Sequence, residues 1–377
     1  MLTVDKVKQK FNINELPKPS MVIDSSIIAG KYENLKNLID GVQVFYSVKT
    51  NPHVEVIRLL DKLGAGFEIS SLPELKDLIS LGIPADKIIS GNTLKVPQMI
   101  EEAHKYGVNY FAYDSETEVD KIAQYAPGAN VSLRISVDNT GSDWPLSKKF
   151  GAPMSKALEL FKYAQEKGLK PHGLTFHVGS QCLNPLGWSN ALMTIAEVYY
   201  LAKRNGVKLE VINMGGGFPS KLNKKIPSME IIRENINKTI KDTFANEGLK
   251  FYIEPGRGLV GESALMVASV IGKATRGAEN WLILDVGVYN GLLEAVAGIE
   301  YEFVSDKEIN GLTHVNDLIP YHIGGPTCDS WDTIIKNYNL PSDLKVGDII
   351  YILNTGAYTI SEATRFNGFD PPKTFFI

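Results

Sequence analysis

The sequence predicts a two-domain α/β protein, in which a (β/α)8 TIM-like barrel precedes a C-terminal all-β domain. Between residues 42 and 254, short β-branched or aromatic runs alternate eight times with longer amphipathic stretches. The turn after the first run lacks the Gly-x-Gly-x-x-Gly that opens a doubly wound sheet. After Gly258 the helical periodicity gives way to strand-like runs separated by Gly, Pro and Asn turns. These three observations favour a closed barrel followed by a β domain.

The eight strands expected in the barrel follow one another at the spacing of strand–helix units. Eight such units close into a parallel barrel more readily than they form an open sheet. The expected strands are Val42–Val48, Gly66–Ile69, Lys87–Ser90, Asn109–Tyr113, Asn130–Ser136, His172–Val178, Leu209–Met214 and Leu249–Ile253.

The segments between these strands have apolar residues on one helical stripe and polar residues elsewhere. Two of them also carry a start signal. Ser71 with Glu74, and Ser115 with Glu118, have the spacing of a capping box, so each pair predicts the first turn of a helix.

The β domain is expected to contain strands from both ends of the chain. Ser20–Ile23 precedes the first barrel helix and can join the C-terminal strands. We therefore predict a barrel at residues 25–260 and a β-sandwich or β-barrel domain at residues 1–24 and 261–377. The C-terminal strands expected are Ala264–Ile271, Trp281–Asp285, Asp348–Leu353 and Thr374–Ile377.

Composition indicates a small-molecule enzyme. The 377 residues are 44% hydrophobic and carry a net charge of -4 with both signs interspersed, which provides no basic face for nucleic acid or membrane lipid. Residues 1–19 lack the apolar core of a signal peptide, and no run reaches the roughly 18 apolar residues of a membrane helix. A cytoplasmic protein is expected. Cys182 and Cys328 lack metal-ligand spacing and are expected to be free thiols.

Reactive side chains recur where the predicted strands end, which is where (β/α)8 barrels carry their active sites. Lys49 ends the first strand, Glu68 lies on the second and Arg134 on the fifth, and His177-Val-Gly-Ser180 follows the sixth. A lysine at a strand end is held rigidly and is open to a pocket. Taken alone, a solvated loop lysine or a core histidine is the ordinary alternative.

Gly215, Gly216 and Gly217 directly follow the seventh strand, and this run predicts an anion site. Three glycines allow backbone N–H groups to approach an anion closely. The eighth strand is followed by Glu254-Pro-Gly256-Arg257, whose arginine adds a fixed positive charge. Barrels favour a phosphate site at strands seven and eight. A tight turn is the alternative explanation for the glycines.

Glu254 beside a phosphate cradle calls for a cationic partner. The protonated pyridine nitrogen of pyridoxal 5'-phosphate (PLP) is such a partner, with Lys49 binding the cofactor aldehyde as a Schiff base. Imidazole stacking on the ring then accounts for His177. The alternative for Glu254 is a buried ion pair with Arg257 or another base. No zinc-ligand spacing and no Gly-x-Ser-x-Gly elbow is present, so we expect no metal and no serine nucleophile.

Two turns of the C-terminal region carry reactive side chains, Gly325-Pro-Thr-Cys328-Asp329-Ser330 and Gly356-Ala-Tyr358-Thr359. A lone cysteine is usually a small buried hydrophobe. Next to Asp329 in a Gly-Pro loop, Cys328 is more plausibly exposed and able to donate a proton.

With these motifs in order, the chain resembles the alanine-racemase-fold, PLP-dependent decarboxylases of basic amino acids, above all the ornithine and lysine decarboxylases. The likeness extends over nearly the whole chain, to Phe366-Asn-Gly368. It implies that Lys49 is the Schiff-base lysine, that His177 stacks on the ring and that Glu254 faces the ring nitrogen. It also implies cofactor contacts from Glu68, Arg134, Ser180, Gly215, Gly216, Gly217, Gly256, Arg257 and Tyr358.

The same resemblance implies a homodimer with shared active sites, in which the loop of Cys328 and Asp329 reaches the barrel of the partner. Cys328 would reprotonate the substrate carbon after carbon dioxide leaves. Asp329 would bind the distal ammonium of the substrate. A monomer is then expected to be inactive.

One departure from the resemblance concerns the substrate. A second aspartate that helps to bind the distal ammonium in eukaryotic-type ornithine decarboxylases is missing after Tyr289, where Glu294 and Glu300 are the nearby carboxylates. Tyr289, Glu294 and Asp329 are therefore the expected substrate contacts. L-ornithine or L-lysine is favoured, because no extra arginine suits the second carboxylate of meso-diaminopimelate.

Other functions stay open. Carboxynorspermidine, a D-amino acid or a siderophore intermediate is an alternative substrate. A racemase of the same fold would have an arginine in place of Glu254. A catalytically inactive regulatory homologue would be expected to lose Lys49 or the phosphate contacts, and this sequence keeps both.

Overall fold

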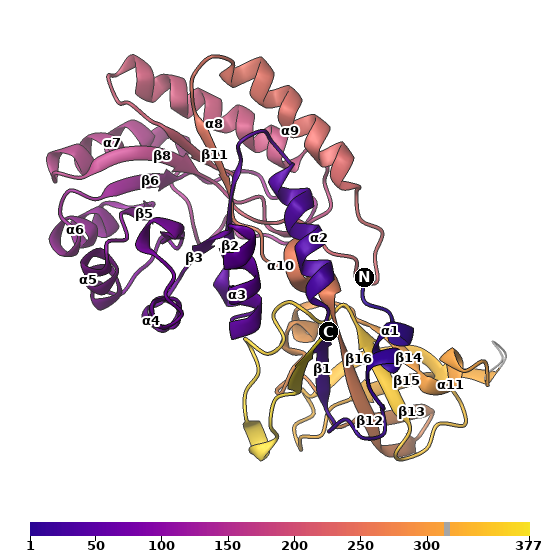
Figure 1. Cartoon of the computed structure of the whole chain (residues 1–377). Coiled ribbons are helices and arrows are strands. Elements are labelled where there is room, and N and C mark those ends of the chain that lie inside the picture. Colours follow the sequence, from indigo (N-terminus) through magenta and orange to yellow (C-terminus); the bar gives the residue numbers. More distant parts are fainter. Residues whose placement is uncertain (313–316) are drawn as a thin grey trace. The chain divides into compact units, whose positions relative to one another are not determined.

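The computed structural model describes residues 1–312 and 317–377 (Figure 1). The described residues form two compact units. One contains residues 31–219 and 226–259, and the other contains residues 1–30, 220–225 and 260–377.

The first unit is built on an all-parallel sheet of eight strands in the order β4-β3-β2-β11-β10-β8-β6-β5. A bridge between Ser90 and Phe111 joins the two end strands and closes the barrel. Each expected strand is present with its ends shifted by a few residues, so the predicted (β/α)8 barrel is confirmed. The strands are β2 (Gln43–Ser47), β3 (Gly66–Glu68), β4 (Ile88–Ile89), β5 (Tyr110–Tyr113), β6 (Asn130–Arg134), β8 (Lys170–Thr175), β10 (Val211–Asn213) and β11 (Lys250–Ile253).

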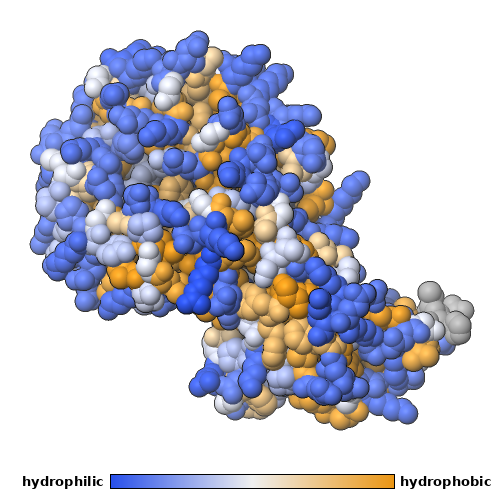
Figure 2. Space-filling model, viewed as in Figure 1, coloured by the Kyte–Doolittle hydropathy of each residue, from blue (hydrophilic) through white to orange (hydrophobic). Residues whose placement is uncertain are grey.

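Helices cover the outside of this barrel, and the outer surface seen in Figure 2 is largely hydrophilic. In α3, Val56, Ile57 and Leu60 are buried on one face, as expected for an amphipathic helix. The helices are α2 (Ser25–Lys36), α3 (Val54–Leu63), α4 (Leu72–Ser80), α5 (Pro97–Tyr106), α6 (Glu116–Tyr125), α7 (Ala157–Glu166), α8 (Gly187–Arg204), α9 (Met229–Phe244) and α10 (Arg257–Val260).

The two expected capping boxes differ from the prediction. Ser71 accepts a hydrogen bond from the N–H of Glu74, but the Glu74 carboxylate accepts from the N–H of Ser70 instead of closing the box on Ser71. Ser115 makes no side-chain cap on α6. Glu118 pairs instead with Lys95 at 2.9 Å and with Lys121 at 2.6 Å. The second capping box was therefore wrong, because a buried ion pair takes the glutamate away from the helix end.

The second unit is a mostly antiparallel β structure with the path β14-β17-β12-β13-β15-β16. β1 pairs with β12 and β18, which confirms that the N-terminal strand joins the C-terminal domain. Its strands are β1 (Ser20–Ile23), β12 (Ala264–Arg276), β13 (Glu279–Leu284), β14 (Glu302–Ser305), β15 (Leu318–Gly324), β16 (Thr333–Pro341), β17 (Ile349–Leu353) and β18 (Lys373–Phe376).

Two short helices, α1 (Val4–Lys10) and α11 (Asp306–Ile309), complete this unit. Val7 of α1 belongs to the same buried apolar cluster as Val22, Leu265 and Tyr351. The N-terminal segment is thus part of the core of the second unit, through α1 as well as through β1.

Three strands of the second unit were not anticipated, namely β14, β15 and β16. Pro320 lies inside β15, and proline in a run argues against a central strand. β16 contains Asn337 in the left-handed region at φ 58°. Because such residues are unusual inside strands, local sequence patterns do not predict these strands.

Among the described residues, no helix has both the length and the apolar character required to span a membrane.

Candidate active site

Lys49 lies in a short 3-10 turn, η1 (Val48–Thr50), directly after β2. Its Nζ is 2.8 Å from Oε2 of Glu68, which belongs to the neighbouring strand β3. The lysine side chain is 46% exposed, whereas the glutamate side chain is 2% exposed. The structure therefore places this amine at the carboxyl end of the barrel, held by a buried carboxylate and open to solvent.

Glu254 directly follows β11, the other neighbour of β2. Its Oε1 accepts a hydrogen bond of 2.7 Å from Nδ2 of Asn213. A Cβ atom at Gly91 would lie 2.6 Å from Oε1 of Glu254 and 2.8 Å from Cγ of Glu68. The two carboxylates therefore approach each other across a glycine that leaves room for both.

This crowding changes the pKa of Glu254. Loss of solvation by burial, followed by the negative charge of Glu68, raises the pKa of Glu254 to about 7, while Lys49, Asn213 and Arg134 oppose the rise. A carboxyl group that titrates near neutrality responds strongly to a cation placed beside it. Perturbed groups of this kind cluster at functional sites.

His177 follows β8, and its imidazole is uncharged. Burial, together with the positive charges of Arg134 and Lys49, lowers the pKa of His177 to about 3. Its Nδ1 accepts a hydrogen bond of 2.9 Å from the N–H of Gly179. Asn139 Nδ2 donates to the carbonyl oxygen of His177 at 2.9 Å. A neutral, fixed imidazole is suited to stacking on a flat ring rather than to pairing with an anion.

Any residue larger than glycine would cause a steric conflict at the three positions after β10. Gly215 and Gly217 have φ of 63° and 95°. Added Cβ atoms at Gly215, Gly216 and Gly217 would lie 2.2, 2.6 and 2.5 Å from the carbonyl oxygens of Phe176, Glu254 and Gly179. The loop is packed between the ends of β8 and β11, and it leaves space only for backbone.

Three further cofactor candidates lie near this loop. A Cβ atom at Gly256 would lie 2.2 Å from Oγ1 of Thr50, next to Lys49. Arg257 follows as the first residue of α10 and is 5% exposed. Ser180 starts β9 (Ser180–Cys182), which pairs with β7 (Ser142–Trp144). The structure thus brings Lys49, Glu68, Arg134, His177, Glu254, Gly256 and the glycine loop together at one end of the barrel.

In the second unit, two of the expected substrate residues are in direct contact. Tyr289 donates a hydrogen bond of 2.6 Å to Oδ2 of Asp329. That bond is the first cause that lowers the pKa of Asp329, which stays charged. Cys328 is an exposed thiol, as expected, and its Sγ donates to Oδ1 of Asn367 at 3.3 Å. Cys182, the other thiol, is free and buried.

The remaining expected residues of the second unit have distinct settings. Glu294 lies in a 3-10 turn, η5 (Leu293–Ala297), and is 4% exposed. Glu300 is exposed and its Oε2 accepts from Nδ2 of Asn223 at 3.2 Å. Tyr358 adopts a left-handed φ of 53° after Gly356.

Sequence reasoning missed residues that shape this site. Asn213 and Gly91 touch Glu254, and Asp332 accepts hydrogen bonds from the N–H groups of Val288 and Thr327, beside the expected substrate residues. Position offered a signal for two of them, since Asn213 lies at the end of the seventh expected strand, next to Met214, and Gly91 follows the third. Asp332 offered none, because its contact with Val288 joins residues 44 positions apart.

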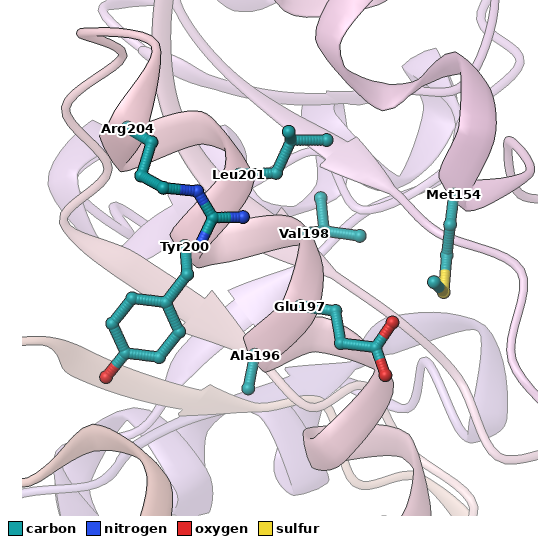
Figure 3. A pocket seen from close by; sticks show the side chains of 7 residues that line it. All are labelled: Met154, Ala196, Glu197, Val198, Tyr200, Leu201 and Arg204. Carbon is teal, nitrogen blue, oxygen red and sulfur yellow. The ribbon is translucent and has the colours of Figure 1, made fainter.

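One cavity lies apart from these residues. It has a volume of about 500 Å³ and runs along α8, with Met154 at its side (Figure 3). Its other lining residues, Ala196, Glu197, Val198, Tyr200, Leu201 and Arg204, all belong to α8. It contains none of the expected site residues. Within residues 1–312 and 317–377, no group of three His, Cys, Asp or Glu side chains could hold a metal ion.

The barrel end fits a phosphorylated aldehyde cofactor. Lys49 provides an amine, the glycine loop provides a backbone turn that carries no side chains beside the ends of β8 and β11, and Arg257 provides a cation. Glu254 provides a carboxylate whose raised pKa leaves it ready for a cationic ring nitrogen. The donor set therefore agrees with PLP.

Comparison with known proteins gives the same result. Residues 25–261 match the family described as pyridoxal-dependent decarboxylase, pyridoxal binding domain. The chain is 36% identical over 358 residues to a lysine/ornithine decarboxylase of Selenomonas ruminantium, covering 94% of this chain and 88% of that protein. It is also 31% identical over 359 residues to antizyme inhibitor 2 of Xenopus laevis, covering 92% and 78%.

Solved structures agree over the full chain. SrLDC in complex with PLP and cadaverine matches with a TM-score of 0.90 and 33% identity, covering 100% of this chain and 94% of that chain. The arginine decarboxylase of Paramecium bursaria Chlorella virus, bound to agmatine, matches with a TM-score of 0.90 and 28% identity, covering 99% and 100%. The chain therefore belongs to the pyridoxal-dependent decarboxylase family and is a PLP-dependent decarboxylase.

Proposed function

We propose that this enzyme removes the α-carboxyl group of L-ornithine or L-lysine, releasing carbon dioxide and the corresponding diamine. The observation that carries the proposal is the Tyr289–Asp329 contact, which keeps a carboxylate charged next to the exposed thiol of Cys328. A charged carboxylate favours a substrate whose far end is an ammonium group. The lysine/ornithine decarboxylase among the relatives supports the same choice.

Each residue expected at the cofactor has a proposed task. Bound PLP supplies an electron sink for the electron pair left when the bond to the carboxyl group breaks. Lys49 binds the cofactor aldehyde, and Glu254 holds a positive charge on the ring nitrogen. His177, neutral at physiological pH, stacks on the ring. Ser180, the glycine loop, Gly256, Arg257 and Tyr358 hold the phosphate, and Glu68 and Arg134 line the cofactor.

The second unit is proposed to handle the substrate and its proton. Asp329 binds the distal ammonium, with Tyr289 fixing the orientation of its carboxylate. Cys328 Sγ gives one proton to the substrate carbon in place of the lost carboxyl group and recovers it from solvent. The overall change is amino acid plus one proton to diamine plus carbon dioxide. An exposed thiol can be reprotonated between turnovers.

We further propose that the active enzyme is a homodimer with shared sites. Trp331 is 68% exposed, and Phe366 and Phe369 are 41% and 37% exposed. Phe366 packs on Tyr289 with ring centroids 4.6 Å apart, so this aromatic group surrounds the expected substrate residues. Large exposed apolar side chains of this kind mark surfaces that a partner covers.

A second candidate function is decarboxylation of a larger or differently charged substrate. The buried Glu294 favours it, because a carboxylate in η5 stands where the resemblance predicts a different acidic group. Carboxynorspermidine, meso-diaminopimelate, D-ornithine, D-lysine and a siderophore intermediate belong to this class. An inactive regulatory homologue is disfavoured, because Lys49 and the glycine loop are intact.

The test is a substrate panel with the purified, PLP-loaded enzyme. L-ornithine, L-lysine, L-arginine, their D-isomers, meso-diaminopimelate and carboxynorspermidine are incubated separately, and the released amine is identified by mass spectrometry. We expect putrescine from L-ornithine or cadaverine from L-lysine, with carbon dioxide in equal amount. Turnover of a larger substrate alone would replace the first candidate with the second. No turnover of any substrate would support the inactive homologue.

A further inference from the structure

Asn213 ends β10 and is completely buried. Both polar atoms of its side-chain amide make hydrogen bonds. Nδ2 donates to Oε1 of Glu254 at 2.7 Å, and Oδ1 accepts from the N–H of Gly215 at 3.0 Å. One side chain thereby joins the carboxylate on β11 to the first residue of the glycine loop.

The charged and titratable groups around Glu254 come from several strands. Glu68 on β3 adds negative charge, while Lys49 after β2 and Arg134 on β6 add positive charge. Tyr110 on β5 faces Glu254, and its hydroxyl lies beside Ser132 and Asn213. Within this set, Asn213 is the neutral donor that makes a direct hydrogen bond to Glu254.

The chemistry of the amide explains why an asparagine suits this position. Its Nδ2 group can only donate, and its Oδ1 can only accept. Aspartate has nearly the same shape and could still accept from Gly215, but it would offer Glu254 a negative charge instead of a hydrogen. Replacing Asn213 with aspartate therefore separates the two contacts of the side chain.

We propose that Asn213 is a positioning residue that keeps Glu254 ionised and oriented, and that it couples this carboxylate to the turn of the glycine loop. The inference rests on the proposed role of Glu254 at the cofactor ring. Asn213 itself is not proposed to contact the cofactor or the substrate. It acts through the donor it gives to Glu254 and the acceptor it gives to Gly215.

The first test measures Glu254 in the protein without cofactor. Infrared difference spectra follow the carbonyl band of the protonated carboxyl group across pH, and the band is assigned by its loss in Glu254→Gln. In Asn213→Asp we expect the titration of this band to move up by about one pH unit or more, since a donor is lost and a like charge is gained.

The matched control is Asn109→Asp. Asn109 is exposed before β5, and its Oδ1 accepts from the N–H of Asn130 at 3.2 Å, a contact that aspartate keeps. The same chemical change at this position should leave the Glu254 band where it is in the wild type. An unchanged band in Asn213→Asp as well would overturn the inference.

A double-mutant cycle gives a second readout, independent of activity. In Asn213→Asp with Glu254→Gln, the glutamine amide can donate to the aspartate, so the hydrogen bond is restored with reversed polarity. We expect the double variant to melt at a higher temperature than Asn213→Asp alone. Additive effects of the two substitutions would contradict the proposed contact.

The loaded enzyme distinguishes this inference from the proposed function. Asn213→Asp should lower kcat at pH 7 at least about tenfold, move the acidic limb of the pH profile upward and change KM little. Full activity of Glu254→Gln would remove the proposed role of Glu254. Low activity of Glu254→Gln, together with a normal pH profile for Asn213→Asp, would overturn only the role of Asn213.

Discussion

At the scale of single residues, the two acidic groups beside Lys49 differ in kind. Glu68 is buried and forms an ion pair with the amine at 2.8 Å. Glu254 accepts a hydrogen bond from the neutral Asn213, which opposes the rise of its pKa to about 7 that burial and the charge of Glu68 cause. The sequence located both carboxylates from their places at strand ends. It could not reveal Asn213 as the partner of Glu254, because the two residues are 41 positions apart and meet only through the pairing of β10 with β11.

Lys49→Ala should remove the near-visible absorbance of the cofactor-loaded enzyme and abolish decarboxylation. The reason is that the proposed attachment point of the aldehyde is lost. Absorbance spectra after incubation with PLP measure the effect. Lys62→Ala, an exposed lysine on α3, should have the wild-type spectrum. A normal spectrum for Lys49→Ala would assign the attachment to another amine.

Glu254→Gln should stabilise the protein without cofactor at alkaline pH. The folded-state pKa of Glu254 is raised to about 7 from an ordinary 4.5, so its contribution to stability is fully present below pH 4.5 and is lost as the pH rises through 7. A glutamine side chain does not ionise, so the variant does not lose this stability as the pH rises. Melting temperatures should agree at pH 4.5 and differ by at least roughly 2 °C at pH 8. Equal melting temperatures at pH 8 would show that Glu254 is not desolvated.

At the scale of elements, the barrel was predictable and the second unit only partly so. Barrel strands are short apolar runs that alternate with helices, and each of the eight appears in the sequence as such a run. β15 and β16 carry Pro320 and the left-handed Asn337, which local patterns assign to loops. β15 pairs with β16, the next strand along the chain, and also in parallel with β13, which precedes it by more than 30 residues.

The glycine loop after β10 yields a test with a close control. Gly217→Ala places a Cβ atom 2.5 Å from the carbonyl oxygen of Gly179, at a φ of 95°. Gly206→Ala meets no atom within 4 Å but has a similar φ of 77°. Both should lose about 1 kcal/mol to backbone strain. Only Gly217→Ala should also weaken PLP binding, at least about tenfold, measured by fluorescence titration. Equal PLP affinities would exclude the loop as the phosphate cradle.

At the scale of the whole molecule, the proposed active site takes residues from two chains. Lys49 belongs to the first unit, and Cys328 and Asp329 belong to the second. The sequence suggested this division through its resemblance to dimeric decarboxylases. No local pattern in one chain predicts a site shared by two chains. Two copies associate through the surfaces of the folded protein, and the hydrophobic periodicity of the sequence does not describe those surfaces.

Mixing two inactive variants tests the shared site. Lys49→Ala and Cys328→Ala are each expected to have little activity. After dissociation and reassembly in equal amounts, half of the dimers contain one of each, and one of their two sites has both residues. Activity should recover to roughly a quarter of the wild-type value. No recovery, with mixed dimers confirmed by native mass spectrometry, would mean that each site is built by one chain.

Few backbone hydrogen bonds close the barrel between β4 and β5. β4 has two residues, and the link to β5 consists of the Ser90 N–H donating to Tyr110 at 3.0 Å and the Ala112 N–H donating to Ser90 at 2.8 Å. Because so few hydrogen bonds join β4 to β5, the barrel should open first at this contact. The amide hydrogen of Ala112 should therefore exchange with deuterium faster than the amide hydrogens that pair β6 with β8. Because Gly91 follows Ser90 and rests against Glu254, each opening would admit solvent to that carboxyl group. Such local opening would expose the half-buried carboxyl group of Glu254 further to solvent while the rest of the barrel stays closed.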